Sequence, residues 1–276
     1  MKVTVIEPHG FCAGVTGAIR KALGLSDSAS GRVYCLHELV HNELVVAELK
    51  SKGFVFVESI DEVPAGSTVL FSAHGVSPAV REAAAARGLA VVDATCPFVT
   101  RVHKSARAFA DRGLPVVVIG NAKHVETKGI LGEVPDSVVV ESPEGVDAVA
   151  IAPGTRIGVV SQTTMNADTV KTIVARLGER YAVETMAVVC NATKERQDAV
   201  KAFDGDAVLV LGSANSSNTR KLCDVAKVKT YRAATIAEVN ALDFAGVEHL
   251  GITSGASTPE TFFREVVAAV LARSAV

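Results

Sequence analysis

Short runs of β-branched and other apolar residues alternate along the chain with longer stretches in which apolar residues recur at helical spacing. The pattern repeats nine times and predicts an α/β fold built from βα units with parallel sheets. The expected strands span 3–6, 33–36, 68–71, 90–92, 115–119, 156–160, 184–189, 207–211 and 249–252. The expected helical stretches include 42–51, 78–87, 98–112, 167–177, 193–203, 220–228 and 259–273. A further strand, 138–141, follows a stretch poor in helix signals and is expected at a sheet edge.

Residues with polar or sulfur-bearing side chains follow all nine of the main strands. Ligands of parallel sheets bind at the carboxyl ends of strands, where the next helix offers free N–H groups. In chain order these turns carry Cys12; Glu38 to His41; His74; Cys96; His124 and Glu126; Gln162 and Thr163; Cys190; Ser216 to Asn218; and Ser257. Every third turn therefore carries a cysteine.

The spacing of these cysteines suggests three modules. Cys12, Cys96 and Cys190 are separated by 84 and 94 residues, and 98 residues lead from Cys190 through the two termini back to Cys12. Three similar βα modules around a pseudo-threefold axis would bring the three thiols together, and their expected bounds are 13–96, 97–190, and 191–276 with 1–12. The similarity between the thirds is too weak to establish a repeat, so scattered packing cysteines stay an alternative.

Composition excludes several classes of protein. The 28 Lys and Arg residues nearly balance the 30 Asp and Glu residues, and no block of basic residues is present, which argues against a nucleic-acid or anionic-membrane partner. No apolar run approaches the roughly 20 residues of a spanning helix, and the first apolar run is too short for a signal sequence. We expect a cytoplasmic protein. Its five cysteines are an odd number and are expected to be reduced.

Three thiolates at helix N-termini suit a soft metal centre. Zinc held by three cysteines is one candidate, and an iron-sulfur cluster with three cysteine ligands and one open iron is the other. The remaining cysteines, Cys35 within a strand and Cys223 on a helical stretch, are expected to be packing residues. The same holds for four histidines away from these turns: His9, His37, His103 and His249.

The other turns supply neutral hydrogen-bond donors without a Lys or Arg among them. Such a set can bind phosphate through neutral groups and helix N-termini, although serines and asparagines at these places are often simple helix caps. The residues concerned are His41, His74, His124, Ser216, Ser217, Asn218 and Ser257. Glu126 with Thr163 adds a proton source.

With these residues in view, the sequence resembles the LytB/IspH family, the 4-hydroxy-3-methylbut-2-enyl diphosphate reductases, over its whole length. The motifs that carry the resemblance are Gly10-Phe11-Cys12-Ala13-Gly14-Val15, Val40-His41-Asn42, Ser72-Ala73-His74-Gly75-Val76, Asp93-Ala94-Thr95-Cys96-Pro97, Ser161-Gln162-Thr163-Thr164, Cys190-Asn191-Ala192-Thr193 with Arg196-Gln197, Gly212-Ser213-Ala214-Asn215-Ser216-Ser217-Asn218 and Gly255-Ala256-Ser257. The resemblance implies a three-lobed α/β trefoil around a central 4Fe-4S cluster.

The resemblance also implies an activity and roles for these residues. The reaction is a two-electron reductive dehydroxylation that yields isopentenyl or dimethylallyl diphosphate for isoprenoid synthesis, with electrons from a ferredoxin or a flavodoxin. Cys12, Cys96 and Cys190 hold the cluster, and one iron stays open to the substrate. The diphosphate binds to His41, His74, His124, Ser216, Ser217, Asn218 and Ser257. Glu126, Thr163 and His124 form the catalytic group, in which Glu126 and Thr163 relay the proton.

Four positions depart from the family pattern. Asn121 and Val125 stand where a His and a Pro are usual, and Gly17 and Leu36 replace common arginines. Residues that surround a metal site tune it. A divergent paralogue acting on another allylic diphosphate, a non-catalytic iron-sulfur redox sensor and a zinc hydrolase with three cysteine ligands are therefore kept as alternatives.

Overall fold

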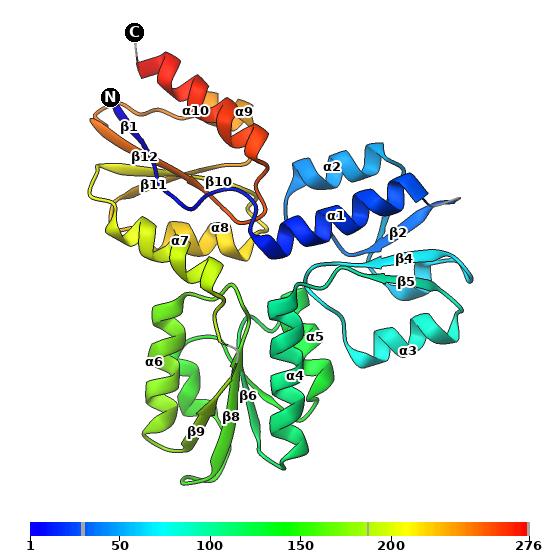
Figure 1. Ribbon diagram of the computed structural model, residues 1–276. Coiled ribbons are helices and arrows are strands. Elements are labelled where there is room, and N and C mark those ends of the chain that lie inside the picture. Colours follow the sequence, from blue (N-terminus) through cyan, green and yellow to red (C-terminus); the bar gives the residue numbers. More distant parts are fainter. Residues whose placement is uncertain (29–30, 187, 275–276) are drawn as a thin grey trace.

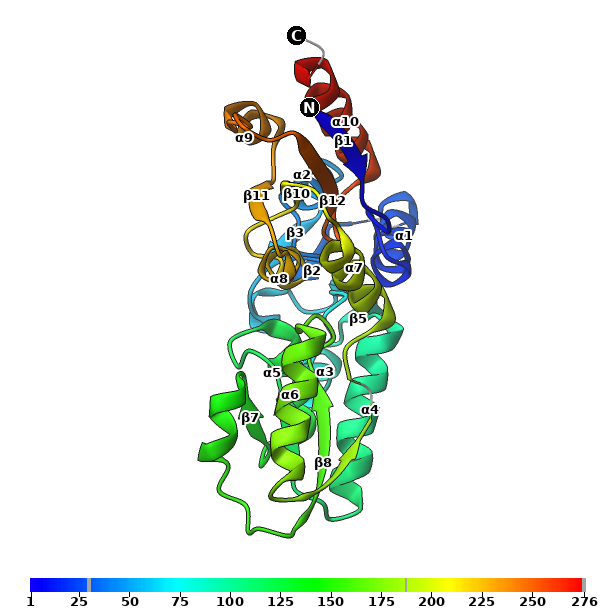
Figure 2. The same ribbon diagram turned by 90° about the vertical axis from the view of Figure 1, so that its left-hand side faces the viewer.

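The computed structural model describes residues 1–28, 31–186 and 188–274, and shows three α/β lobes that meet at one centre (Figure 1). Each lobe contains one four-stranded sheet in which every neighbouring pair of strands is parallel. Figure 2, turned by 90°, shows the lobe of β6 to β9 at one end of the molecule and the lobe that contains both chain ends at the other. The predicted three-lobed trefoil with parallel sheets is confirmed.

The three sheets share one strand order. The first contains β3 (Val55–Val57), β2 (Val33–Leu36), β4 (Thr68–Phe71) and β5 (Ala90–Asp93). The second contains β7 (Val138–Val140), β6 (Val116–Ile119), β8 (Arg156–Ser161) and β9 (Ala182–Thr185). The third contains β11 (Lys229–Ala233), β10 (Ala207–Leu211), β12 (His249–Ser254) and β1 (Lys2–Val5). Strands in the same place of each order are therefore equivalent, and β5, β9 and β1 share the last place.

Helices connect these strands and cover the sheets. The α-helices are α1 (Ala13–Ser28), α2 (Glu43–Ser51), α3 (Pro78–Ala86), α4 (Pro97–Asp111), α5 (Val125–Glu133), α6 (Ala167–Gly178), α7 (Asn191–Ala202), α8 (Ser217–Val225), α9 (Ile236–Ala241) and α10 (Glu260–Ser274). Two short 3-10 helices are η1 (Ile60–Glu62) and η2 (Pro143–Ala148). In the part of the chain described, no helix has both the length and the apolar character needed to cross a membrane.

Each sheet has an apolar cluster on both of its faces. In β6 the side chains of Val117 and Ile119 lie in one cluster, and those of Val116 and Val118 lie in the other. A strand that is buried on both faces is an unbroken apolar run, because neither face meets water. This burial explains why the central strands could be read directly from the sequence.

Sequence reasoning was less accurate at the sheet edges. It missed β3, which has three residues, and β11, whose Lys229 and Arg232 make it polar. The expected strand 184–189 includes residue 187, which lies outside the described residues, and β9 ends at Thr185. The strand near 138–141 does lie at an edge, as expected. The three sheets fall within the three expected modules, whose exact bounds stay a prediction.

One expectation was wrong: the stretch before β7 is not poor in helix, since it forms α5. Two glycines hide this helix in the sequence, because glycine is a weak helix former. A Cβ added to Gly132 would lie 2.2 Å from the Cβ of Ser77, and one added to Gly129 would lie 3.2 Å from the His103 ring. These glycines therefore allow close packing of α5 against its neighbours.

Candidate active site

The three cysteines of the repeating turns occupy equivalent places in the three lobes. Each follows the last strand of its sheet order (β1, β5 or β9), and each stands just before the first residue of a helix (α1, α4 or α7). The helix N-termini point toward the centre of the molecule (Figure 1). In each lobe the backbone N–H of the cysteine donates to a carbonyl of a neighbouring turn. Cys12 donates to Ala256 at 3.2 Å, Cys96 to Ala73 at 3.0 Å, and Cys190 to Thr163 at 3.2 Å.

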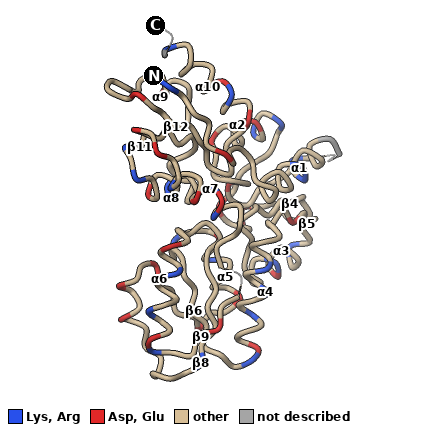
Figure 3. Tube along the Cα trace, turned by 60° about the vertical axis from the view of Figure 1, so that its left-hand side comes forward, with Lys and Arg blue, Asp and Glu red and all other residues tan. Residues whose placement is uncertain are grey.

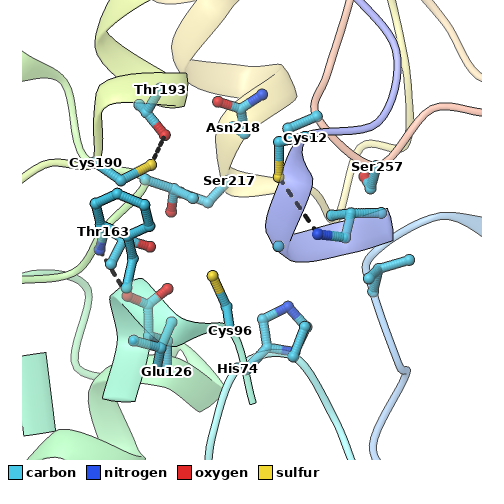
Figure 4. A pocket seen from close by; sticks show the side chains of 18 of the residues that line it. Cys12, His74, Cys96, Glu126, Thr163, Cys190, Thr193, Ser217, Asn218 and Ser257 are labelled. Carbon is cyan, nitrogen blue, oxygen red and sulfur yellow. Dashed lines mark hydrogen bonds between the residues drawn. The ribbon is translucent and has the colours of Figure 1, made fainter. Parts of the chain in front are cut away.

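The three thiols line one central cavity of about 100 Å³. Figure 4 shows the sulfur atoms of Cys12, Cys96 and Cys190 directed toward a common space. Gly14, in the first turn of α1, keeps this space open. A Cβ at that position would lie 2.5 Å from the Cys96 sulfur and 3.8 Å from the Cys12 sulfur, so any larger residue would displace a thiol.

The surroundings of the thiols bear on whether they could hold a metal. Among the described residues, no group of three or more His, Cys, Asp or Glu side chains lies close enough together in this structure to hold a metal ion. A zinc ion needs every sulfur at about 2.3 Å, whereas the ligands of a cluster bind different irons and can stand further apart. Burial raises the pKa of the Cys96 and Cys190 thiols in the metal-free chain, so a bound cation is needed to favour their thiolates.

Three histidines from two lobes meet at one side of the cavity. The ring centroids of His41 and His74 are 4.2 Å apart, and those of His41 and His124 are 5.2 Å apart. Burial lowers the pKa of His74 well below its ordinary value and that of His124 to about 4, and the neighbouring histidines add to both shifts. Both rings are therefore neutral near pH 7, and they can donate hydrogen bonds without carrying charge.

Three residues that line the cavity carry buried polar atoms without a partner. These atoms are Nε2 of His41, Nε2 of His124, and both side-chain polar atoms of Asn218. The other ring nitrogens are engaged: Nδ1 of His41 lies 2.9 Å from Glu38, and Nδ1 of His124 accepts from the N–H of Glu126 at 3.2 Å. Buried polar atoms normally have partners, so this group indicates a polar ligand that completes the site.

The first turn of α8 adds hydrogen-bond donors to the same wall. Ser216 caps this helix by accepting from the N–H of Thr219 at 3.2 Å, and Ser217 and Asn218 are its first two residues. A helix N-terminus favours anions because its free N–H groups and its dipole both point at the ligand. Ser257 also lines the cavity and donates to the carbonyl of His41 at 3.0 Å. In the described chain no Lys or Arg lines the cavity, so an anion there would meet neutral donors.

Among the described residues, Glu126 is the one carboxyl group that lines the cavity, and it is 2% exposed. Its Oε1 accepts a hydrogen bond from the N–H of Thr163 at 2.6 Å. Burial raises the pKa of Glu126 to about 7, and the hydrogen bonds from Thr163 offset only part of this shift. The group can therefore hold and release a proton near neutral pH.

The structure brings all twelve candidate site residues to this cavity. They are Cys12, His41, His74, Cys96, His124, Glu126, Thr163, Cys190, Ser216, Ser217, Asn218 and Ser257. Sequence reasoning missed the apolar part of the lining, because apolar residues in a sequence look like ordinary core residues. Val15, Val40, Phe98 and Val99 belong to this part.

The residues expected to serve packing lie elsewhere. Cys35 is fully buried within β2, where burial raises its pKa to about 12, and Cys223 lies on α8 away from the cavity. His103 pairs with Glu133 at 3.1 Å, and His9 stacks on Phe263. Neither histidine lines the cavity.

The four departures from the family pattern also stand outside the cavity lining. Leu36 is buried in the core of its lobe, and a Cβ at Gly17 would meet nothing within 4 Å. Asn121 donates through its side-chain amide to Glu141 at 2.7 Å, and Val125 is the first residue of α5. These replacements leave the residues that face the cavity unchanged.

Comparisons with known proteins agree with one another. The family described as LytB protein matches residues 3–271. A relative from Rhodococcus opacus (strain B4), called 4-hydroxy-3-methylbut-2-enyl diphosphate reductase, is 43% identical over 276 residues and is matched over 96% of this chain and 82% of its own. A relative of the same name from Dechloromonas aromatica (strain RCB) is 42% identical, with 97% of this chain and 90% of the relative covered.

Solved structures show the same fold. The E-1-hydroxy-2-methyl-but-2-enyl-4-diphosphate reductase from Plasmodium falciparum superposes with a TM-score of 0.92 at 32% identity, covering 97% of this chain and 87% of that one. A structure of (E)-4-hydroxy-3-methyl-but-2-enyl diphosphate reductase, described as the terminal enzyme of the non-mevalonate pathway, gives a TM-score of 0.70 at 33% identity. It covers 98% of this chain and 99% of that one.

Proposed function

The chain belongs to the LytB protein family, and from this premise we propose that it catalyses the reductive dehydroxylation of 4-hydroxy-3-methylbut-2-enyl diphosphate. The products are isopentenyl and dimethylallyl diphosphate, the precursors of isoprenoids. Each turnover consumes two electrons and two protons: the C–O bond to the terminal hydroxyl breaks, the hydroxyl leaves as water, and a C–H bond forms. The observation that carries the proposal is the central cavity, which combines three thiols from three lobes with a wall of unpaired neutral donors.

We assign the cofactor to the three thiols. LytB proteins are iron-sulfur enzymes, and the cavity suits such a group, because soft thiolates converge on it from three helix N-termini and Gly14 leaves room beside two of them. We propose that Cys12, Cys96 and Cys190 hold a 4Fe-4S cluster. When bound, a cluster with three protein ligands supplies single electrons and keeps one iron accessible to substrate. The relatives and the family model give no support to the zinc alternative.

We assign the diphosphate to the opposite wall. Nε2 of His124 carries the ring proton, because Nδ1 accepts a hydrogen bond, and it can donate to a phosphate oxygen. The Asn218 amide is unpaired and can donate as well. The remaining donors are His41, His74, Ser216 and Ser217. Ser257 can join them once its hydroxyl turns from the His41 carbonyl toward the phosphate. Neutral donors around a buried anion replace its water shell, so the substrate is held while water is excluded.

We assign proton delivery to Glu126. Its Oε1 is engaged by the N–H of Thr163, so the acidic proton sits on Oε2. Release of this proton to the departing hydroxyl oxygen forms water, and the carboxylate that remains keeps its hydrogen bond to Thr163. The Thr163 hydroxyl passes its proton to Glu126 and takes up another from water, and this second proton serves the new C–H bond. His124, whose Nδ1 accepts from the N–H of Glu126 at the start of α5, orients the substrate beside it.

Turnover with a defined reductant tests the function. Protein purified and loaded with iron and sulfide without oxygen is mixed with the diphosphate substrate and reduced methyl viologen. We expect viologen oxidation with stoichiometric formation of isopentenyl and dimethylallyl diphosphate, detected by mass spectrometry. Cluster-loaded protein that forms neither product would contradict the function, and stoichiometric zinc with no iron in the anaerobically purified protein would contradict the cofactor. In the cell, we propose that the electrons come from a ferredoxin or a flavodoxin.

A further inference from the structure

The proposed function requires two electrons from outside the protein, and any docking site for an electron carrier rests on that function. The three thiols lie in an interior cavity, so a carrier must approach the surface where one of them is nearest to solvent. The surface features that stand beside Cys96 differ from those beside the other two cysteines.

Three exposed apolar residues lie near Cys96 or Cys190 in the sequence. Eight large apolar residues of the described chain are exposed, and three of them are Phe98, Met186 and Val188, which are 43%, 43% and 39% exposed. All three lie within four residues of Cys96 or Cys190 in the sequence. Phe98 also lines the central cavity, so its ring reaches from the cavity to solvent.

A shallow groove along α4 continues this apolar surface. It contains Thr95 and Pro97, the two residues that flank Cys96, and it extends along α4 to Arg101 and Lys104. Met186, from the chain that follows β9, closes its other side. Two residues of the groove are therefore the chain neighbours of Cys96, so a carrier bound there would lie beside a proposed cluster ligand.

The charge of this groove has one sign. Arg101 and Lys104 are exposed, and neither forms an ion pair or a side-chain hydrogen bond within the described residues. No Asp or Glu of the described chain lines the groove. Asp93, just before the groove, is paired with Arg81 at 2.8 Å. The adjoining hollow, which Lys104 also lines, contains Asp111 and Glu133, and Glu133 is paired with His103 at 3.1 Å. Elsewhere charges of both signs are mixed over all three lobes (Figure 3).

The surfaces beside the other ligands are less suitable. Near Cys12, the exposed acids Glu7 and Glu260 flank His9 at 3.0 and 3.3 Å. Near Cys190, Lys194 of α7 is paired with Asp198, and Glu195 beside it is exposed. Unpaired positive charge next to exposed apolar surface is the arrangement expected where an acidic protein docks briefly, because charge steers the encounter and apolar contact holds it.

We propose that the surface formed by Phe98, Arg101, Lys104, Met186 and Val188, here called the α4 surface, docks a small acidic one-electron carrier protein. The carrier delivers one electron in each of two successive encounters and leaves oxidised each time. Both electrons enter beside Cys96 and serve the reduction of one substrate molecule. The two protons and the released water are handled on the other side of the cavity, where Glu126 lies.

Comparison of two reductants tests the α4 surface. The variant R101E/K104E is assayed with reduced flavodoxin and, separately, with reduced methyl viologen. Because neither side chain touches the central cavity, viologen-driven turnover should equal that of the unaltered protein. The KM for flavodoxin should rise at least 10-fold, and the salt dependence of flavodoxin-driven turnover should be lost. Met186→Ser should raise the same KM by a smaller factor.

A charge-matched control separates docking from net charge. K171E/K227E changes the net charge equally at two exposed lysines on α6 and after α8, outside the groove, and it should leave both assays unchanged. Equal flavodoxin kinetics in R101E/K104E and K171E/K227E would overturn the proposal. If the reversed charges prevent folding, R101Q/K104Q carries the same test. Failure of the unaltered protein with viologen would instead contradict the proposed function, so the two outcomes are distinct.

Discussion

The backbone N–H of Thr163, just after β8, donates a hydrogen bond of 2.6 Å to Oε1 of Glu126 in the first turn of α5. This contact joins two turns of one lobe and holds a buried carboxyl group against the central cavity. Burial would favour the neutral form strongly, while the hydrogen bond favours the anion. Their balance places the pKa of Glu126 at about 7.

Replacing Glu126 by glutamine should stop proton delivery and keep the site intact. The amide oxygen of E126Q can still accept from Thr163, but the group has no acidic proton. We expect turnover to fall by roughly 100-fold or more, the size typical for a lost general acid. Iron content, the cluster spectrum and substrate affinity should stay unchanged. Wild-type turnover in this variant would remove Glu126 from the mechanism.

The pKa of Glu126 predicts a descending limb in the curve of turnover against pH. The protonated form acts as the acid, so turnover should decline as the pH rises through about 7. The limb is measured as kcat against pH with methyl viologen as reductant. It should be absent from the residual activity of E126Q, and its persistence in that variant would assign it to another group.

The same pKa predicts a pH effect on stability. Because the folded-state pKa of Glu126 is raised from 4.5 to about 7, the folded chain binds a proton that the unfolded chain has released between these values. The free energy of unfolding of the metal-free protein should therefore fall as the pH rises from 4.5 to 7, by about 3 kcal/mol from this group. E126Q should have a flatter profile in denaturant titrations across this range, and an equally steep one would contradict the assignment.

Two glycines of α1 give a matched pair of variants. Gly14→Ala places a methyl group 2.5 Å from the Cys96 sulfur, and we expect it to abolish cluster retention. Gly17→Ala, three residues along the same helix, meets nothing within 4 Å and should stabilise the protein by about 0.5–1 kcal/mol. Iron analysis and thermal unfolding measure both effects. Full iron content in Gly14→Ala would show that the space beside Cys96 is not needed.

Serine substitutions test the ligand set. Changing Cys12, Cys96 or Cys190 to Ser should remove the brown colour and most of the iron of anaerobically prepared protein. Cys223→Ser is the control, since this thiol lies on α8 outside the central cavity. A cluster that survives the loss of any one of the three thiols would exclude that cysteine as a ligand.

Alanine variants of Asn218 and Asn215 distinguish the loss of a substrate contact from the general effect of shortening a side chain. Asn218→Ala removes a buried unpaired amide, and we expect the KM for the diphosphate substrate to rise roughly 10- to 100-fold, as for a lost hydrogen bond to a charged group. Asn215 lies in the loop just before α8 and is exposed, so Asn215→Ala should leave KM unchanged. Equal KM values in the two variants would remove Asn218 from the binding site.

The local pattern of apolar residues was enough to place the central strands, because a strand buried on both faces must be apolar throughout. It was not enough for β3 and β11, which lie at sheet edges and need little apolar surface. Nor could it identify α5, whose glycines lower helix propensity and are needed for contact with Ser77, before α3, and His103 of α4, both distant in sequence.

By itself, the sequence determined the βα order and the turns that carry chemistry, since both follow from the periodicity of neighbouring residues. The family motifs then suggested which of those turns act together. Only the tertiary structure decided that a Cβ at Gly14 would strike Cys96, that Glu126 is buried, and that Phe98 spans cavity and solvent. These properties depend on how atoms from separate lobes pack, and packing sets the local dielectric and the free space that pattern alone does not specify.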